Sequence, residues 1–270
     1  MVPSAGQLVL LAIAALFFVV GGGISIARVW RPVASLRIAA KACMYSGVLC
    51  SVGVIVWHAS SRGKWQPLGD NFDSLIWLAV LLALFVMYVQ RVKPISGLDW
   101  FVMPIVTLLL VAAGFFGTRD FQEYHSRVQD TWIWVHRVSS YTGAVAFAVA
   151  AAGGAMYVLA SRKLRMKTAG PKLGSLERLE HLMMGAVTLG FALLTVGLIT
   201  GFVRILDGEK APPIPKLALA TLAWVVYAVV MHAPINPRFR GRRAAILSVF
   251  GFVLMIGTLI AVQYVPGGNG

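Results

Sequence analysis

Charged residues are scarce in this sequence. They make up 13% of its 270 positions, whereas hydrophobic residues make up 59%; an average soluble domain carries about 25% charged residues. The acids are the rarer charged class, with 10 Asp and Glu against 24 Lys and Arg, so the net charge is +14. Because the basic residues form short clusters between long apolar stretches, we predict a membrane protein surrounded by lipid and no nucleic-acid partner.

Several chemical signatures are also missing. Cys43 and Cys50 lie seven positions apart in an apolar stretch, with no CxxC pair and no framework of loop cysteines, so we expect small buried hydrophobic residues. There is no Ser-His-Asp arrangement, no phosphate-binding glycine loop and no pair of intramembrane carboxylates. These absences argue against a hydrolase, an NTPase or a typical proton pump, and we expect that the chain is not an enzyme.

Long apolar windows dominate what is present. A helix needs about 20 mainly apolar residues to cross a bilayer. The first window is too long for a signal peptide and lacks a positive n-region and an Ala-x-Ala exit, so it is expected to be a retained span. We therefore predict an all-α, polytopic membrane bundle forming a single transmembrane domain over residues 1–270. Its eight predicted spans are residues 7–27, 38–59, 74–90, 98–117, 132–160, 180–203, 217–233 and 244–264.

The basic residues also predict an orientation. Positive loops stay in the cytoplasm, and one set of alternate connections holds 16 of the 24 Lys and Arg, against 8 in the other. Seven of the ten acids lie on the less basic side. An even number of spans then places both termini outside, and we expect a bacterial inner membrane protein.

Histidines are the best candidates for chemistry, since ionisable groups near a membrane are costly. His58 and His136 fall at predicted outer helix ends, His181 and His232 fall at inner ends, and His125 lies in an outer loop. Each face thus has one possible bis-imidazole pair, which could hold haem iron between helices. Zinc is a weaker candidate, because no HxxxH, HExxH or Cys/His cluster is present.

Aromatic and basic residues accompany the outer histidines. Trp132 and Trp134 are four and two residues before His136, and their rings could stack on a planar macrocycle. Basic side chains could bond haem propionates. The alternative is that the histidines and tryptophans anchor the interface and the basic residues are solvated loop charges. The basic candidates are Arg62, Lys64, Arg127 and Arg137.

Two readings of a different class stay open. A small-solute or ion transporter could line an aqueous path with these histidines, although no broken helices or inverted halves are evident. A non-catalytic structural or regulatory membrane subunit would use them only as interface anchors.

Three segments resemble the cytochrome c assembly family, which includes the CcsA/ResC-type haem handlers and shorter HemX-like and YpjD-like proteins. Residues 134–141 (WVHRVSSY) resemble the family's W-x-x-H-V…S-Y helix opening, and residues 190–201 (GFALLTVGLITG) its GF-x-LLT-x-G-x-x-x-G helix. Residues 224–232 (WVVYAVVMH), with Gly241 and Gly251, resemble its last part. The resemblance covers roughly residues 55–265.

This resemblance implies roles for two histidines. His136 matches the external haem ligand of the CcsA group and His232 the intramembrane one, so a non-covalently bound haem b and partners in cytochrome c maturation or the haem pathway are implied. The chain lacks the group's WGxxWxWDPKE segment and its terminal GLHSYG-type histidine. These departures favour the shorter, HemX-like branch.

Overall fold

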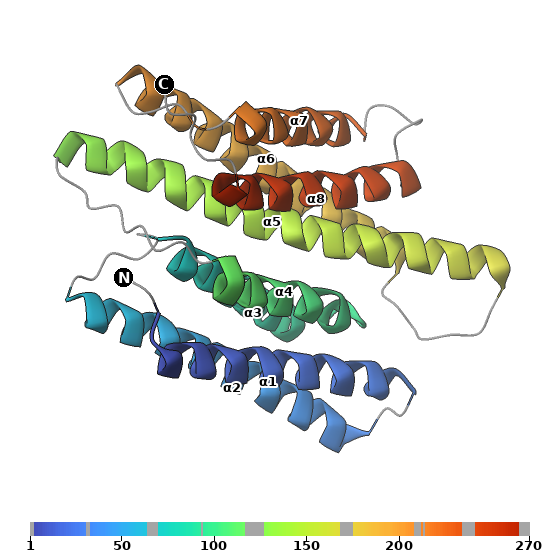
Figure 1. Ribbon diagram of the computed structural model, residues 1–270. Helices are drawn as coiled ribbons and strands as arrows, with labels where there is room; N and C mark the ends of the chain where they lie inside the picture. Colours follow the sequence, from blue (N-terminus) through green and yellow to red (C-terminus); the bar gives the residue numbers. More distant parts are fainter. Residues whose placement is uncertain are drawn as a thin grey trace. The chain divides into compact units, whose positions relative to one another are not determined.

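Every regular element in the described part of the chain is a helix. The computed structural model describes residues 3–30, 33–63, 70–92, 94–116, 127–167, 175–207, 212, 214–233 and 241–264 (Figure 1). The helices are α1 (Ala5–Trp30), α2 (Ala34–Arg62), α3 (Asn71–Val92), α4 (Leu98–Phe116), α5 (Arg127–Met166), α6 (Leu176–Leu206), α7 (Ile214–Met231) and α8 (Arg242–Tyr264). The all-α expectation is confirmed.

Each of the eight predicted spans overlaps one helix, although the span predicted over residues 217–233 continues two residues past the end of α7. Seven helices, α1 to α7, contain described segments long and apolar enough to cross a membrane. The helices run past several predicted boundaries, most of all in α5, which has 40 residues and is about 60 Å long, against about 30 Å of hydrocarbon core. The apolar window marks only the part suited to lipid, and the helical backbone continues over the polar residues on either side.

Two helices begin with a side-chain cap. The Ser175 hydroxyl accepts a hydrogen bond from the Arg178 amide at the start of α6. Ahead of α3, the Asp70 carboxylate accepts one from the Asp73 amide at 2.8 Å. These bonds satisfy amides that have no acceptor within the first turn of a helix.

Contacts divide the chain into two compact units. Unit 1 comprises Met1–Gln122 with Met166–Gly174, and unit 2 comprises Glu123–Arg165 with Ser175–Gly270. In unit 1, α1 packs on α2 and α4, while α3 packs on α4 and α2. The ring of Phe18 on α1 lies against Gly47 on α2, where a Cβ would come within 2.8 Å of it. Cys43 and Cys50 are half-buried free thiols rather than fully buried ones.

Unit 2 is organised around Tyr227 of α7. Its ring stacks on Phe147 of α5 with centroids 3.6 Å apart and planes 9° from parallel, and its hydroxyl donates to the Ser248 carbonyl of α8 at 3.3 Å. A Cβ on Gly251 of α8 would lie 2.8 Å from the same ring. One fully buried aromatic side chain therefore joins three helices.

Glycines set the spacing between α5 and α6. A Cβ on Gly190 of α6 would lie 2.7 Å from Phe147, and one on Gly197 would lie 2.8 Å from the Ser140 hydroxyl. In the other direction, a Cβ on Gly143 would lie 3.3 Å from Leu193. Small residues let membrane helices approach closely, as the glycine spacing of α6 predicts.

This packing can be tested with two alanine substitutions on one helix. Gly190→Ala forces a methyl group against the Phe147 ring and is expected to destabilise unit 2 by about 1–3 kcal/mol. Gly185→Ala is the matched control, because a Cβ there meets nothing within 4 Å. Thermal unfolding in detergent should show a lower midpoint for Gly190→Ala alone, and equal midpoints for the two variants would contradict this account.

Candidate functional site

His136 is held in one orientation by α6. It lies in the third turn of α5, and its Nδ1 atom is 2.8 Å from the Gly197 carbonyl oxygen. A carbonyl oxygen can only accept, so Nδ1 of the neutral imidazole carries the proton and Nε2 keeps its lone pair. Histidines that ligate metals usually donate their other N–H to such a carbonyl or carboxylate. The half-buried ring is therefore prepared to ligate a metal through Nε2.

The end of the glycine-rich motif surrounds the same ring. The Thr200 hydroxyl is 3.5 Å from His136 Nδ1, and it donates to the Val196 and Gly197 carbonyls. A Cβ on Gly201 would lie 3.1 Å from the imidazole Cε1 atom. The motif of residues 190–201 thus supplies the carbonyl that accepts from the His136 ring, and its Gly201 leaves space for that ring.

Three cations gather around His136. Arg204 of α6, Lys216 of α7 and Arg137 of α5 are all near enough to act electrostatically on its imidazole. Of these three cations, only Arg137 was among the basic candidates from the sequence. Arg204 follows Gly197 and Gly201 at positions i+7 and i+3, on the same face of α6, and that spacing could have identified it. Lys216 carries no comparable sequence signal, because only folding brings α7 to this end of α5.

The two tryptophans before His136 differ in exposure. Trp132 is 39% exposed, whereas Trp134 is half-buried. Deeper in unit 2, the Trp224 indole donates to the Thr195 hydroxyl at 2.9 Å and lies 5.4 Å from the Phe191 ring. Trp224 therefore joins α7 to α6. Trp132, four residues before His136, lies on the same face of α5 as that histidine, whereas Trp134, two residues before it, does not.

His232 has the same tautomer as His136. It follows α7 directly, is exposed, and its Nδ1 lies 2.7 Å from the Ala228 carbonyl oxygen. That bond again leaves the lone pair on Nε2. Since Lys216 near the start of α7 lies by His136, His232 beyond the end of α7 lies toward the opposite end of unit 2.

His181 lies toward the same end as His232 but not at the same level. The Trp224–Thr195 bond is a common reference point: His232 is eight residues after Trp224, and His181 is fourteen residues before Thr195. At 1.5 Å per residue these distances are about 12 and 21 Å along the two helices. His181 is exposed near the start of α6, and its pairing with His232 stays a prediction.

His58 has a different environment, in a buried polar network of unit 1. Its side chain is 1% exposed; Nε2 lies 3.2 Å from Asp70 and Nδ1 lies 3.3 Å from the Gln7 side chain. Arg62 forms ion pairs with Asp70, at 2.8 Å, and with Asp73. Both imidazole nitrogens of His58 are thus engaged, unlike those of His136 and His232. His58 and His136 belong to different units, and their pairing stays a prediction.

The Asp70 carboxylate is central to this network. Burial alone would raise its pKa, but the hydrogen bonds with His58 and the Asp73 amide, and the positive charge of Arg62, outweigh burial and hold the pKa below its ordinary value of 3.8. His58, Asp70 and Asp73 each offer a ligand atom within 4.8 Å of the others, as a metal site would require. Because the Arg62 guanidinium already bonds both carboxylates, we assign the cluster to ion pairing.

Some predicted residues fall outside the described part of the chain. They are His125 and Lys64, together with the side chain of Arg127.

Unit 2 therefore has, toward its two ends, a histidine that donates through Nδ1 to a helix carbonyl and leaves Nε2 as an acceptor. Helices of membrane-spanning length define a multi-pass membrane protein, and each of these two imidazoles could ligate a metal through Nε2. Comparison with known proteins identifies the family. The family described as "Cytochrome C assembly protein" matches residues 68–266, and the chain belongs to it.

Individual relatives agree with this assignment. The chain is 27% identical to a cytochrome c biogenesis protein CcsA of Prochlorococcus marinus, over 96% of this chain and 88% of that protein. It is 34% identical to CcsA of Microcystis aeruginosa, over 44% of this chain and 38% of that one. Among solved structures, a cytochrome c heme lyase CcmF has the same fold, with a TM-score of 0.68 and 16% identity over 96% of this chain and 47% of that chain.

The buried network in unit 1 can be tested through its one arginine. Arg62→Met leaves Asp70 and Asp73 buried without their guanidinium partner and is expected to cost about 3–5 kcal/mol. Arg37→Met, at an exposed position nearer the start of α2, is the control. Thermal unfolding in detergent should show a large drop for Arg62→Met only, and an unchanged midpoint would rule out a stabilising role for the network.

Proposed function

We propose that this chain is an integral membrane protein that binds haem b non-covalently and assists cytochrome c assembly. The observation that carries the proposal is the His136 site: an imidazole fixed by the Gly197 carbonyl, with Nε2 available and three cations around it. Membership of the cytochrome c assembly family supports the biological setting.

The residues of this site fit the chemistry of haem. Haem iron accepts axial imidazole, which His136 would provide through Nε2. The propionates are anionic, and Arg137, Arg204 and Lys216 offer charge-assisted hydrogen bonds to them. Trp132 and Trp134 supply aromatic surface against which the macrocycle could stack. The proposed role is to hold haem, and no step that makes or breaks its covalent bonds is assigned to the chain.

His232 would be the axial ligand of a second position. Its free Nε2 matches that of His136, and the two histidines lie toward opposite ends of unit 2. With the orientation predicted from the basic loops, His136 would serve the outer face and His232 the inner face of a bacterial inner membrane. The proposed partners are other membrane proteins of cytochrome c maturation or the haem pathway. His58 and His181 stay predicted ligands, outside this proposal.

Haem content provides the direct test. Chain purified with haem supplied should show a Soret band, and both His136→Ala and His232→Ala should lose part of the haem measured as pyridine haemochrome, because each removes an axial nitrogen. His136→Gly with added imidazole should regain haem, since free imidazole can occupy the vacated position. Wild-type haem content in both alanine variants would refute the ligand assignment.

Cytochrome assembly is tested separately in cells. Deleting the gene should remove covalent haem from the c-type cytochromes and leave b-type cytochromes intact, because only the former require haem attachment. Haem-stained gels measure this, with wild type, His136→Ala and His232→Ala supplied in trans. Normal c-type cytochromes in the deletion strain would contradict the assembly role even if the purified chain binds haem.

A further inference from the structure

A cavity lies in unit 2 away from His136, among α5, α6 and α8. Its volume is about 630 Å³, and it is lined by residues near the end of α5 and near the starts of α6 and α8. The nearest of these on α5, Tyr157, is 21 residues from His136, or about 30 Å along the helix. That distance is about the thickness of the hydrocarbon core, so the cavity belongs at the other membrane boundary.

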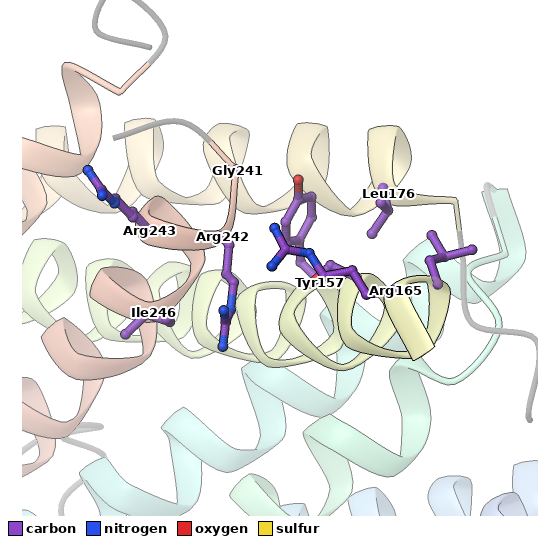
Figure 2. A pocket seen from close by; sticks show the side chains of 9 residues that line it. Tyr157, Arg165, Leu176, Gly241, Arg242, Arg243 and Ile246 are labelled. Carbon is purple, nitrogen blue, oxygen red and sulfur yellow. The ribbon is translucent and has the colours of Figure 1, made fainter. Parts of the chain in front are cut away.

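The polar side of the cavity is cationic. Arg165 of α5 and Arg242 of α8 both line it, and neither forms an ion pair with any residue in the described ranges. Figure 2 shows the Arg165 guanidinium beside the Tyr157 ring and the Arg242 side chain extending across α5, whereas Arg243 points away from both. The acids of the first turns of α6, Glu177 and Glu180, do not line the cavity. Arg243 lines the cavity as well, so an anion there would meet arginines and no lining carboxylate.

Hydroxyl and backbone donors add to this polar side. Tyr157 and Ser161 line the cavity beside the arginines. Gly241, in the left-handed region at φ 68°, allows close approach, since a Cβ there would lie 2.8 Å from the Tyr157 hydroxyl. The chain enters α8 directly after Gly241, so the first amides of a 23-residue helix lie at the same place. Helix N-termini favour phosphate and other anions.

The rest of the lining is apolar. Leu164 is 66% exposed and Ile246 is 48% exposed, and Leu176 also contributes. Exposed apolar side chains at the ends of membrane helices contact acyl chains. The cavity thus combines a cationic, hydroxyl-bearing part with an apolar part, which suits an amphiphile with an anionic head. Among described lining residues there is no histidine, so a haem there would lack imidazole.

We propose that this cavity binds the phosphate of an anionic phospholipid, with Arg165 and Arg242 on the phosphate oxygens and the acyl chain along Leu164 and Ile246. Arginine presents a planar fork of donors that matches phosphate. Basic pockets between membrane helices are a recognised way to bind lipid headgroups. The apolar wall favours a lipid over free phosphate, which has nothing to place there.

The test uses the full chain in neutral detergent and native mass spectrometry. Wild type should retain one phosphatidylglycerol at concentrations where phosphatidylcholine is not retained, and inorganic phosphate should not displace it. Each basic residue near a headgroup contributes about fivefold in binding, so Arg165→Gln with Arg242→Gln should weaken retention roughly 10- to 30-fold. Arg165→Lys with Arg242→Lys keeps the charges and should stay closer to wild type.

A charge-matched control distinguishes binding at this cavity from nonspecific attraction of an anionic lipid to a basic protein. Arg37→Gln with Lys41→Gln removes the same charge from exposed positions of α2 in unit 1 and should leave retention within about twofold of wild type. Equal losses in the two double variants, equal retention of the two lipids by wild type, or displacement by inorganic phosphate would each overturn the proposal.

A measurement on the wild-type protein tests the same proposal if the double glutamine variant fails to fold. Phenylglyoxal modifies accessible arginines, and peptide mass spectrometry reports the extent at each one. Phosphatidylglycerol should slow modification of Arg165 and Arg242, while Arg37 reacts as before. Equal protection of all three arginines, or none at Arg165 and Arg242, would count against the site.

Discussion

The bond from His136 to the Gly197 carbonyl depends on how closely α5 approaches α6. Three glycines face the other helix at contacts where a Cβ would come within 2.7 to 3.1 Å, at Gly190, Gly197 and Gly201. Larger side chains there would separate the helices and move the carbonyl out of reach of Nδ1. The same approach brings Arg204 toward the imidazole. The geometry of the site is thus a consequence of helix packing, to which the residues of the motif contribute mainly by being small.

Hydrogen bonding distinguishes the histidines of this chain more clearly than their position along it. His58 uses both nitrogens inside a buried network, and contacts with Gln7 and Asp70 fix the orientation of its ring. His136 and His232 each use Nδ1 on a carbonyl. In a neutral ring that choice leaves a lone pair on Nε2, the form a metal requires. All three lie near the ends of the predicted spans, so position in the sequence treats them alike, although His136 lies in the third turn of α5.

The sequence was sufficient to predict the helices, because the length of an apolar stretch is a local signal. It was insufficient for contacts that depend on tertiary packing. Arg204 and Lys216 lie far from His136 in the sequence, and only the approach of α6 and α7 brings their charges to it. Likewise, the ion pairs of Asp70 and Asp73 with Arg62 require the start of α3 to return to the end of α2. Local signals predicted the elements and missed the convergence of charges.

The basic residues of unit 2 have two separate physical explanations. Charge counting treats Lys and Arg as signals for which loops stay in the cytoplasm, and it needs only their number on each side. It does not explain why Arg137, Arg204 and Lys216, from three different helices, should all act electrostatically on one imidazole. Arg137 and Arg204 also act electrostatically on Lys216, so α5, α6 and α7 bring like charges together. Charge counting cannot account for this arrangement, because it takes no notice of which helices pack against one another.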